Sequence, residues 1–357
     1  MKSINIAGRE IGSETAPYII AELSANHNGS IETALKIIEA AYDAGADAVK
    51  IQTYRPDTIT LKSDLPDFQI TDGLWKGYTL WDLYEWAHTP WEWHKDLFAF
   101  AKKLGITIFS SPFDPTAVDF LEDLDAPAYK VASFEAIDLP LIKYIASTGK
   151  PMIISTGMAD ADEIQEALDA AREGGCTQIA LLHCVSGYPA PASDYNLRTI
   201  PNMAKRYGTI VGLSDHTLDS ATAIASVALG AAIIEKHVTL DRTGGGPDDS
   251  FSLEPDDLAA LCRDAKTAWC ALGEASYARK SSEQDNVKFR RSLYFVKNLE
   301  AGDIIKPGDI RSIRPGYGLA PKHYEKLFGL KLCRPAKSGT PLSIKDLEAS
   351  AQLIVSK

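Results

Sequence analysis

Eight short runs of apolar, mostly β-branched residues recur between residues 18 and 238, and segments with helical periodicity separate them. Runs of this length that alternate with amphipathic helical segments are typical of parallel strands joined by crossover helices. The predicted strands cover residues 18–23, 48–54, 106–112, 128–133, 152–157, 179–184, 210–215 and 233–238.

The segment after the fifth run carries helix signals at both ends. Asp160 and Glu163 form a capping box before Ile164, and Gly174 stands where the helix should stop. Eight such units within about 255 residues match the size of a (β/α)8, or TIM, barrel, and a doubly wound sheet is the weaker alternative. We therefore expect an α/β fold in which a TIM barrel takes up most of the chain.

The alternation stops after Ser281. The stretch RRSLYFVKNLEAGDIIKPGDIRSIRPGYGLAP contains short apolar runs that Gly and Pro interrupt, which is typical of a small β-rich domain. We predict a catalytic barrel domain with an N-terminal extension over residues 1–273, a linker over 274–286 and a β-rich C-terminal domain over 287–357.

Composition and charge restrict the classes of partner and the cellular compartment that we expect for this protein. The 357 residues include 37 Lys or Arg against 48 Asp or Glu, and this net charge of −11 argues against nucleic acid or an anionic membrane surface as a partner. The N-terminus lacks the apolar core of a signal peptide, and the longest uncharged apolar stretch, 221–234, is too short to cross a bilayer. Five cysteines without a CxxC pair indicate neither a disulfide framework nor a thiolate zinc site, so we expect a cytoplasmic protein.

Polar residues follow every predicted strand. In a TIM barrel the reactive groups lie at the carboxyl ends of the strands. A single strand-end Ser or Lys is most simply a cap or a solvated side chain, but all eight strands contribute here, which favours an active site. The strand-end set is Glu22, Asn26, His27, Lys50, Gln52, Ser110, Ser111, Lys130, Ser133, Glu135, Ser155, Thr156, His183, Ser186, Ser214, Asp215, His216, Glu235 and His237.

His216 and His237 stand at the ends of the last two predicted strands. Side chains two residues apart share a strand face, so Ser214 accompanies His216 and Glu235 accompanies His237. Two imidazoles among hard oxygen groups suit a divalent ion that keeps positions open for water and substrate, which favours Mn²⁺ or a similar ion over a closed structural zinc. Two separate core or hydrogen-bonding histidines explain the spacing equally well.

Lysines and serines surround the same rim. Lys50 and Lys130 supply ammonium groups at two strands. Hydroxyls accompany them at Ser111, Ser133, Ser155 and Ser214. Ammonium and hydroxyl groups that converge from several strands suit a phosphate, even in a protein that is acidic overall.

Two further segments have alternative interpretations. Five of the six tryptophans lie between residues 75 and 93, and packing of a long insertion onto the barrel is favoured over a sugar-stacking surface. The Gly-rich stretch DRTGGGPDDSF, residues 241–251, is either a mobile lid that brings Asp248 and Asp249 near the mouth or a plain solvated loop.

In their order and spacing, the strand-end motifs resemble the sialic acid synthase family. They read AELSANHNGS, VKIQTY, SSPFD, YKVASFE, ISTGM, LLHC..GYP, GLSDHT and EKHVTL. The tail RSLY...RPGYGLAP resembles the antifreeze-like (SAF) C-terminal domain of that family. Within the family, AELSANH, ASFE, the aromatic segment and the loop GGPDDSFSLEP are most similar to pseudaminic acid synthases.

The resemblance implies a phosphoenolpyruvate-dependent transferase. It would condense phosphoenolpyruvate with 2,4-diacetamido-2,4,6-trideoxy-L-altrose, a 6-deoxy diacetamido-hexose, to give pseudaminic acid and phosphate with C–O bond cleavage. An N-acetylneuraminate or legionaminate synthase is the alternative. Another phosphoenolpyruvate-condensing or class II aldolase barrel would leave the tail domain unexplained, and a non-catalytic carbohydrate- or ice-binding protein would have no use for the rim residues.

The resemblance also implies roles for individual residues. Glu22, His216 and His237 match catalytic positions, and the two histidines would bind the metal, Mn²⁺ first, with Mg²⁺ or Co²⁺ as alternatives. The phosphoenolpyruvate positions are matched by Lys50, Ser111, Lys130, Ser133, Ser155, Ser186 and Ser214. The sugar-side positions are matched by Gln52, Glu135, Tyr188, Glu235, Asp248 and Arg314.

Three points complete these expectations. Ser186 departs from the Asn that N-acetylneuraminate enzymes commonly carry. Apolar contacts to the 6-deoxy methyl and the second acetamido group are expected from Tyr54, Phe134 and Phe251. Arg314 is expected to reach the active site of a second chain in a domain-swapped homodimer.

Overall fold

The computed structural model describes residues 3–350, and the chain divides into two compact units, Met1–Gly273 and Glu274–Lys357. In the first unit, eight parallel strands close into a barrel in the order β10-β3-β4-β5-β6-β7-β8-β9. The strands are β3 (Tyr18–Glu22), β4 (Ala48–Thr53), β5 (Thr107–Pro112), β6 (Tyr129–Val131), β7 (Met152–Ser155), β8 (Ile179–Cys184), β9 (Ile210–Asp215) and β10 (Ile233–His237). Each lies within one of the predicted runs, so the predicted TIM barrel is confirmed.

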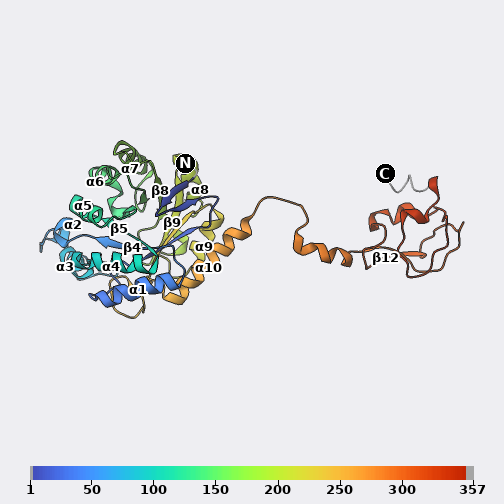
Figure 1. The fold of residues 1–357 in the computed structure, drawn as a ribbon, viewed down its shortest axis with the longest axis horizontal. Helices are drawn as coiled ribbons and strands as arrows, with labels where there is room; N and C mark the ends of the chain where they lie inside the picture. The colour runs from blue at the N-terminus through green and yellow to red at the C-terminus, as the bar shows by residue number, and fades with distance from the viewer. Residues whose placement is uncertain (1–2, 351–357) are drawn as a thin grey trace. The chain divides into compact units, whose positions relative to one another are not determined.

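Helices surround the barrel and connect successive strands (Figure 1). They are α1 (Ile31–Asp43), α2 (Pro56–Ile59), α3 (Leu80–Ala87), α4 (Trp91–Leu104), α5 (Pro115–Asp123), α6 (Leu139–Ala146), α7 (Ala161–Glu173), α8 (Thr199–Tyr207), α9 (Ala221–Ala228) and α10 (Pro255–Leu272). The predicted capping box of α7 is confirmed, because Asp160 and Glu163 bond reciprocally and Gly174 is the C-cap. No helix within residues 3–350 is long and apolar enough to cross a membrane.

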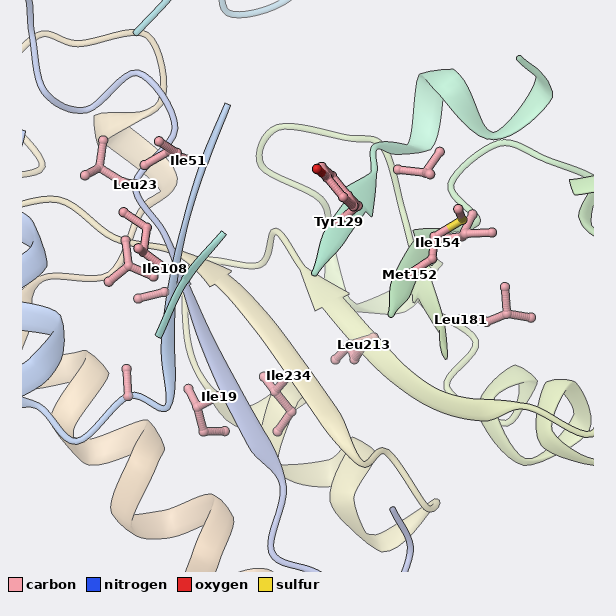
Figure 2. Close-up of a cluster of buried hydrophobic side chains, with 14 of the residues drawn as sticks. Ile19, Leu23, Ile51, Ile108, Tyr129, Met152, Ile154, Leu181, Leu213 and Ile234 are labelled. Carbon is pink, nitrogen blue, oxygen red and sulfur yellow. The ribbon is translucent and has the colours of Figure 1, made fainter. Parts of the chain in front are cut away.

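Alternate strand residues face outward and pack against the helices. Figure 2 shows strand residues of this layer, among them Ile19, Leu213 and Ile234. They belong to one buried cluster together with helix residues such as Ile37 and Leu168. The strands are therefore buried on both faces, which explains why the sequence shows continuous apolar runs instead of alternation.

The other residues of each strand face into the barrel, and the amino-terminal half of this interior is apolar. Tyr18, Phe109 and Ile153 form one buried cluster there. A hairpin of β1 (Ser3–Ile6) and β2 (Arg9–Gly12) adds its isoleucines to the same cluster. The N-terminal extension is thus the floor of the barrel.

The second unit has its own small core. Strands β11 (Ser292–Phe295) and β12 (Ile310–Ile313) pair antiparallel, and short 3₁₀ turns and isolated bridges complete the unit. The predicted linker, residues 274–286, runs into the 3₁₀ helix Ser281–Phe289. In the PGYG turn after β12, a Cβ on Gly318 would lie 2.3 Å from the Leu293 carbonyl oxygen, so only glycine fits this close approach.

Candidate active site

A cavity of about 390 Å³ opens at the carboxyl ends of the barrel strands. A volume of this size suits small-molecule ligands. Most of the site residues predicted from the sequence line it together: Glu22, Lys50, Gln52, Lys130, Ser133, Glu135, Ser155, Tyr188, Ser214, His216, Glu235, His237 and Asp248.

Three of the predicted site residues do not line this cavity. Ser111 pairs with Gln52 across β5 and β4 and is buried. Ser186 lies 2.9 Å from the Ser133 hydroxyl, behind a residue that does line the cavity. Arg314 belongs to the second unit, where its side chain is exposed.

Four charged side chains of the cavity lining lie close together. The Lys50 ammonium lies 3.2 Å from a Glu22 carboxylate oxygen and 3.0 Å from a Glu235 carboxylate oxygen. The Lys130 ammonium lies 4.0 Å from the same Glu235 oxygen, which also accepts a hydrogen bond from Ser214 at 3.1 Å. All four charged groups are buried, so their charges act on one another and on a ligand with little screening by water.

The two carboxyl groups differ in their protonation. Burial raises the pKa of Glu22, and the neighbouring Lys50 only partly offsets this effect. Burial would also raise the pKa of Glu235, but Lys130 and Lys50 together outweigh burial and lower it. Burial lowers the pKa of Lys130 to about 8. Glu235 is therefore the ionised partner of both lysines, and Glu22 is the carboxyl group that can gain or lose a proton near neutral pH.

His216 and His237 face each other across the end of β9 and β10, with ring centroids 5.4 Å apart. The His216 Nδ1 lies 2.8 Å from the Val185 carbonyl oxygen. A carbonyl only accepts, so Nδ1 carries the proton and Nε2 keeps its lone pair. Burial lowers the pKa of His216 to about 4, and burial also lowers the pKa of His237 well below its ordinary value, so both rings are neutral.

These features fit a metal ion. Neutral imidazoles are the form that binds metals, and an Nδ1–H bonded to a backbone carbonyl is the usual way to fix a ligating ring. Within residues 3–350, the buried His237 Nδ1 has no hydrogen-bond partner, although an Asp248 carboxylate oxygen lies 3.5 Å away. In the described part of the chain, no group of three or more His, Cys, Asp or Glu side chains is arranged so that it could hold a metal ion, so a metal on the two histidines would keep positions for water and substrate.

Asp248 and Asp249, two adjacent aspartates in the loop after β10, have different roles. Asp248 lines the cavity and accepts a hydrogen bond from the Ser24 hydroxyl. Asp249 is 1% exposed and accepts bonds from Asn28 at 3.0 Å and from the Gly246 N–H at 2.7 Å. The expectation that both aspartates lie near the mouth is thus met by Asp248, whereas Asp249 holds the loop together.

The tryptophans of the aromatic segment, residues 75–93, also have different roles. Trp75 lines the cavity, and its ring centroid lies 5.7 Å from that of Tyr188. The Trp75 indole N–H donates a hydrogen bond to the Pro247 carbonyl at 3.0 Å. Trp91 stacks on Phe120 at 4.7 Å, outside the cavity. The interpretation as packing holds for Trp91, and Trp75 is the tryptophan at the cavity.

One side of the cavity is apolar, and the segment between β4 and β5 supplies most of it. The residues from this segment are Tyr54, Ile59, Ile70, Trp75, Leu80, Leu83, Tyr84 and Ala87, and Phe113 and Phe134 join them. Of the three apolar candidates from the sequence, Tyr54 and Phe134 line the cavity. Phe251 does not; it is buried beside the His237 ring, 5.1 Å away between centroids.

Sequence reasoning missed two residues that shape the site. Ser24 lines the cavity and accepts from Gln52 at 3.0 Å, and its place two residues after Glu22 was a usable signal. A Cβ on Gly157 would lie 2.3 Å from the Ser133 Cβ, so glycine is needed where the loop after β7 meets the serines. The sequence carries no local signal for that close approach.

Comparison with known proteins identifies the family. A NeuB family model matches residues 37–277, and a SAF domain model matches residues 290–348. The chain belongs to the NeuB family. The resemblance to sialic acid synthases found in the sequence is thereby confirmed, as is the pairing of a TIM barrel with a SAF domain.

Two curated relatives and one solved structure place the chain within the NeuB family. It is 43% identical over 331 residues to the pseudaminic acid synthase of Campylobacter jejuni subsp. jejuni serotype O:2, covering 93% of this chain and 96% of the relative. It is 41% identical over 335 residues to the pseudaminic acid synthase of Helicobacter pylori, covering 94% and 98%. The crystal structure of N-acetylneuraminic acid synthetase from Leptospira borgpetersenii matches with a TM-score of 0.71 at 31% identity, covering 81% of this chain and 96% of that chain.

Proposed function

We propose that this NeuB family member is a cytoplasmic pseudaminic acid synthase. It condenses phosphoenolpyruvate with 2,4-diacetamido-2,4,6-trideoxy-L-altrose and releases inorganic phosphate. The observation that carries the proposal is that one cavity holds a buried lysine pair with serine hydroxyls, a neutral histidine pair and an apolar wall. The sequence identity to pseudaminic acid synthases supports the choice of sugar.

Phosphoenolpyruvate binds at the lysine side of the cavity. Lys50 and Lys130 offer two buried cations, and the Ser155 hydroxyl has no hydrogen-bond partner among residues 3–350, so it is free to donate to an anion. Ser133 and Ser214 line the same wall. Ser111 and Ser186 lie behind that wall, and we assign them to it as supporting hydroxyls.

The metal site is formed by His216 and His237, and Mn²⁺ is the ion we assign, with Mg²⁺ or Co²⁺ as alternatives. When bound, the metal supplies a Lewis acid that polarises the aldehyde oxygen of the sugar. The chain itself fixes the ring of His216 through the Val185 carbonyl and keeps both rings neutral by burial.

The reaction places C3 of phosphoenolpyruvate against the aldehyde carbon of the open-chain sugar. The new C–C bond leaves positive character at C2, water adds there, and the bond between C2 and the phosphate oxygen breaks to release phosphate. Glu22 orients the aldehyde or transfers the proton to its oxygen, which its raised pKa permits. On the sugar side we place Gln52, Glu135, Tyr188, Glu235 and Asp248.

The apolar wall receives the sugar's 6-deoxy methyl and acetamido methyl groups. Tyr54, Leu83 and Phe113 offer carbon surface where a 6-hydroxylated sugar would bury an unpaired hydroxyl. A polar group buried without a partner costs about 1–3 kcal/mol, which corresponds to a factor of about 5 to 150 in kcat/KM.

Each site is completed, we propose, by Arg314 from a second copy in a domain-swapped homodimer. Arg314 is exposed and makes no ion pair within the described part of the chain. The turn that follows it is tightly held, because the Gly318 N–H donates to Ser292 at 2.9 Å and Ser292 donates to the Pro315 carbonyl at 2.6 Å. Such a turn presents its arginine rigidly.

Phosphate release from phosphoenolpyruvate tests the proposal. The purified enzyme is assayed with the diacetamido-altrose and with N-acetylmannosamine, each with Mn²⁺ and with EDTA. We expect phosphate release only with a sugar and Mn²⁺, and kcat/KM at least about fivefold higher for the 6-deoxy sugar. Comparable values for both sugars would overturn the substrate assignment, and full activity in EDTA would overturn the metal assignment.

A further inference from the structure

A buried ion pair lies directly behind the two histidines, on the outer face of the barrel wall. The Lys236 ammonium lies 3.0 Å from the Asp215 carboxylate, and both side chains are almost wholly buried. β9 and β10 are in register so that Lys236 and Asp215 are Cα partners. Neither residue lines the cavity.

The alternation of the strands explains this placement. Ser214 and Glu235 point into the barrel with the histidines, whereas Leu213 and Ile234 belong to the outer apolar layer in Figure 2. Asp215 and Lys236 continue that outer layer by the two-residue period. They are thus two charges at positions that apolar residues occupy lower in the same strands.

The pair also binds the backbone that follows His216. Lys236 donates to the Thr217 carbonyl at 2.6 Å, and the Thr217 N–H donates to Asp215 at 2.9 Å. On the other side, the His216 N–H donates to the Tyr195 hydroxyl at 2.6 Å. The peptide units on both sides of His216 are therefore fixed by hydrogen bonds.

Stability alone gives little reason for charges at these positions. A buried ion pair pays a large desolvation cost, and well-packed apolar residues at the same positions are often as stable. The pair instead fixes the local geometry. Lys236 precedes His237, and it binds the Asp215 carboxylate and the Thr217 carbonyl, which belong to the two residues next to His216.

We propose that Lys236, Asp215 and Tyr195 are positioning residues that set the separation of His216 and His237 for metal binding. The inference rests on the proposed function, since it takes the two histidines as metal ligands. Groups behind metal ligands commonly change metal affinity 10- to 100-fold when they are replaced. The pair therefore contributes through the two rings and does not touch the substrate.

The test is Mn²⁺ binding by the full-length chain, followed by the electron paramagnetic resonance signal of free Mn²⁺. The main variant is the double change Asp215→Asn with Lys236→Met, which removes both charges so that neither remains unpaired. We expect its Kd for Mn²⁺ to rise about 10- to 100-fold while its unfolding midpoint stays close to that of the wild type. Excess Mn²⁺ should restore most of its kcat.

Two further variants make the result decisive. The control is Lys150→Met with Glu122→Gln, which removes an ion pair of 2.8 Å beside β6 and β7 and should leave Mn²⁺ affinity unchanged. Tyr195→Phe removes the hydroxyl that accepts the His216 N–H and leaves the ion pair in place, so it reports on positioning even if the double variant does not fold. We expect its Kd to rise by about threefold or more.

Each outcome has one meaning. Wild-type affinity in the double variant or, where that variant does not fold, in Tyr195→Phe would overturn the positioning role and leave the metal site intact. Absence of Mn²⁺ binding in the wild type would instead overturn the metal assignment in the proposed function. A loss of affinity shared with the Lys150→Met, Glu122→Gln control would show that the effect is not specific to the pair behind the histidines.

Discussion

The same strands build the apolar floor of the barrel interior and its mouth, which is the cavity at the carboxyl ends of the strands. Along each strand, the change from floor to mouth occurs between inward-facing residues that are two positions apart. On β3, Tyr18 and Ile20 belong to the apolar floor and Glu22 lines the cavity. On β10, Ile233 is in the floor and Glu235 and His237 line the cavity. The floor buries carbon surface and contributes to folding, whereas the mouth buries charges that folding alone would disfavour. The difference teaches that stability and chemistry can be separated along a single strand.

The largest expected effect is at the mouth. His216→Ala removes one proposed metal ligand, and we expect kcat to fall by about 10³-fold or more, since Lewis-acid stabilisation is worth several kcal/mol. The unfolding free energy should change by about 1 kcal/mol or less, because rim residues contribute little to the core. Phosphate-release kinetics and urea unfolding measure the two quantities. His88→Ala, in the segment between β4 and β5 but outside the cavity lining, is the control that should keep both.

The reverse pattern is expected at the floor. Ile6 is fully buried in the hairpin, and Ile6→Ala should lower the free energy of unfolding by about 2–5 kcal/mol through lost transfer energy and a residual cavity. The folded fraction should keep its kcat. The same substitution at half-buried Ile59, which lines the cavity, should cost less stability and raise the KM for the sugar. A loss of kcat in Ile6→Ala with unchanged stability would contradict the division between floor and mouth.

A smaller effect is expected from the burial of Glu135 at the mouth, which should make the free energy of unfolding depend on pH. Burial raises the pKa of Glu135 to about 7 from its ordinary value of 4.5. The folded state therefore holds a proton that the unfolded chain has released, so this contribution to stability is complete below about pH 4.5 and is lost as the pH rises through 7. Glu135→Gln should thus stabilise the protein at pH 8 by about 1–2 kcal/mol, because partial exposure reduces the full effect, and should have no effect near pH 4.

Urea unfolding at several pH values measures this difference. Glu166→Gln, at an exposed position on α7, is the matched control and is measured at the same pH values. A Glu135→Gln variant that is equally stable relative to the wild type at pH 5 and pH 8 would show that Glu135 is not protonated by burial.

The sequence predicted the barrel strands and the residues at the mouth, but it did not predict the hairpin at the floor. Strands of a parallel barrel are buried on both faces, so β3 to β10 appeared as apolar runs, and the strand-end position of residues such as Lys50 and His216 placed them together at the mouth. The floor hairpin was missed because two four-residue strands carry too little pattern, and its burial depends on a barrel that forms from distant segments.

The remaining misses have the same physical origin. Lys236 lies on the outer face, where the period predicts an apolar residue, so only the register with Asp215 shows its partner. The apolar wall comes from a long segment between β4 and β5, in which tertiary packing decides that Trp75 faces the cavity and Trp91 does not. Burial of Phe251 behind the histidines could likewise not be seen from its place in a Gly-rich loop.

The smallest expected signal tests whether the mouth is complete within one chain. Chains carrying His216→Ala and chains carrying Arg314→Ala are each expected to be inactive, and the two are unfolded and refolded together. In a swapped dimer, random pairing makes roughly half of the dimers mixed, and one of the two sites in each mixed dimer combines an intact barrel with an intact Arg314. About a quarter of wild-type activity should then return, measured as phosphate release. If Arg314 serves its own barrel, every site keeps one lesion and the mixture stays inactive, while a refolded wild-type sample controls for recovery. If the mixture stays inactive while the refolded wild type recovers fully, each active site is formed by a single chain. That result would contradict our proposal that a second chain supplies Arg314.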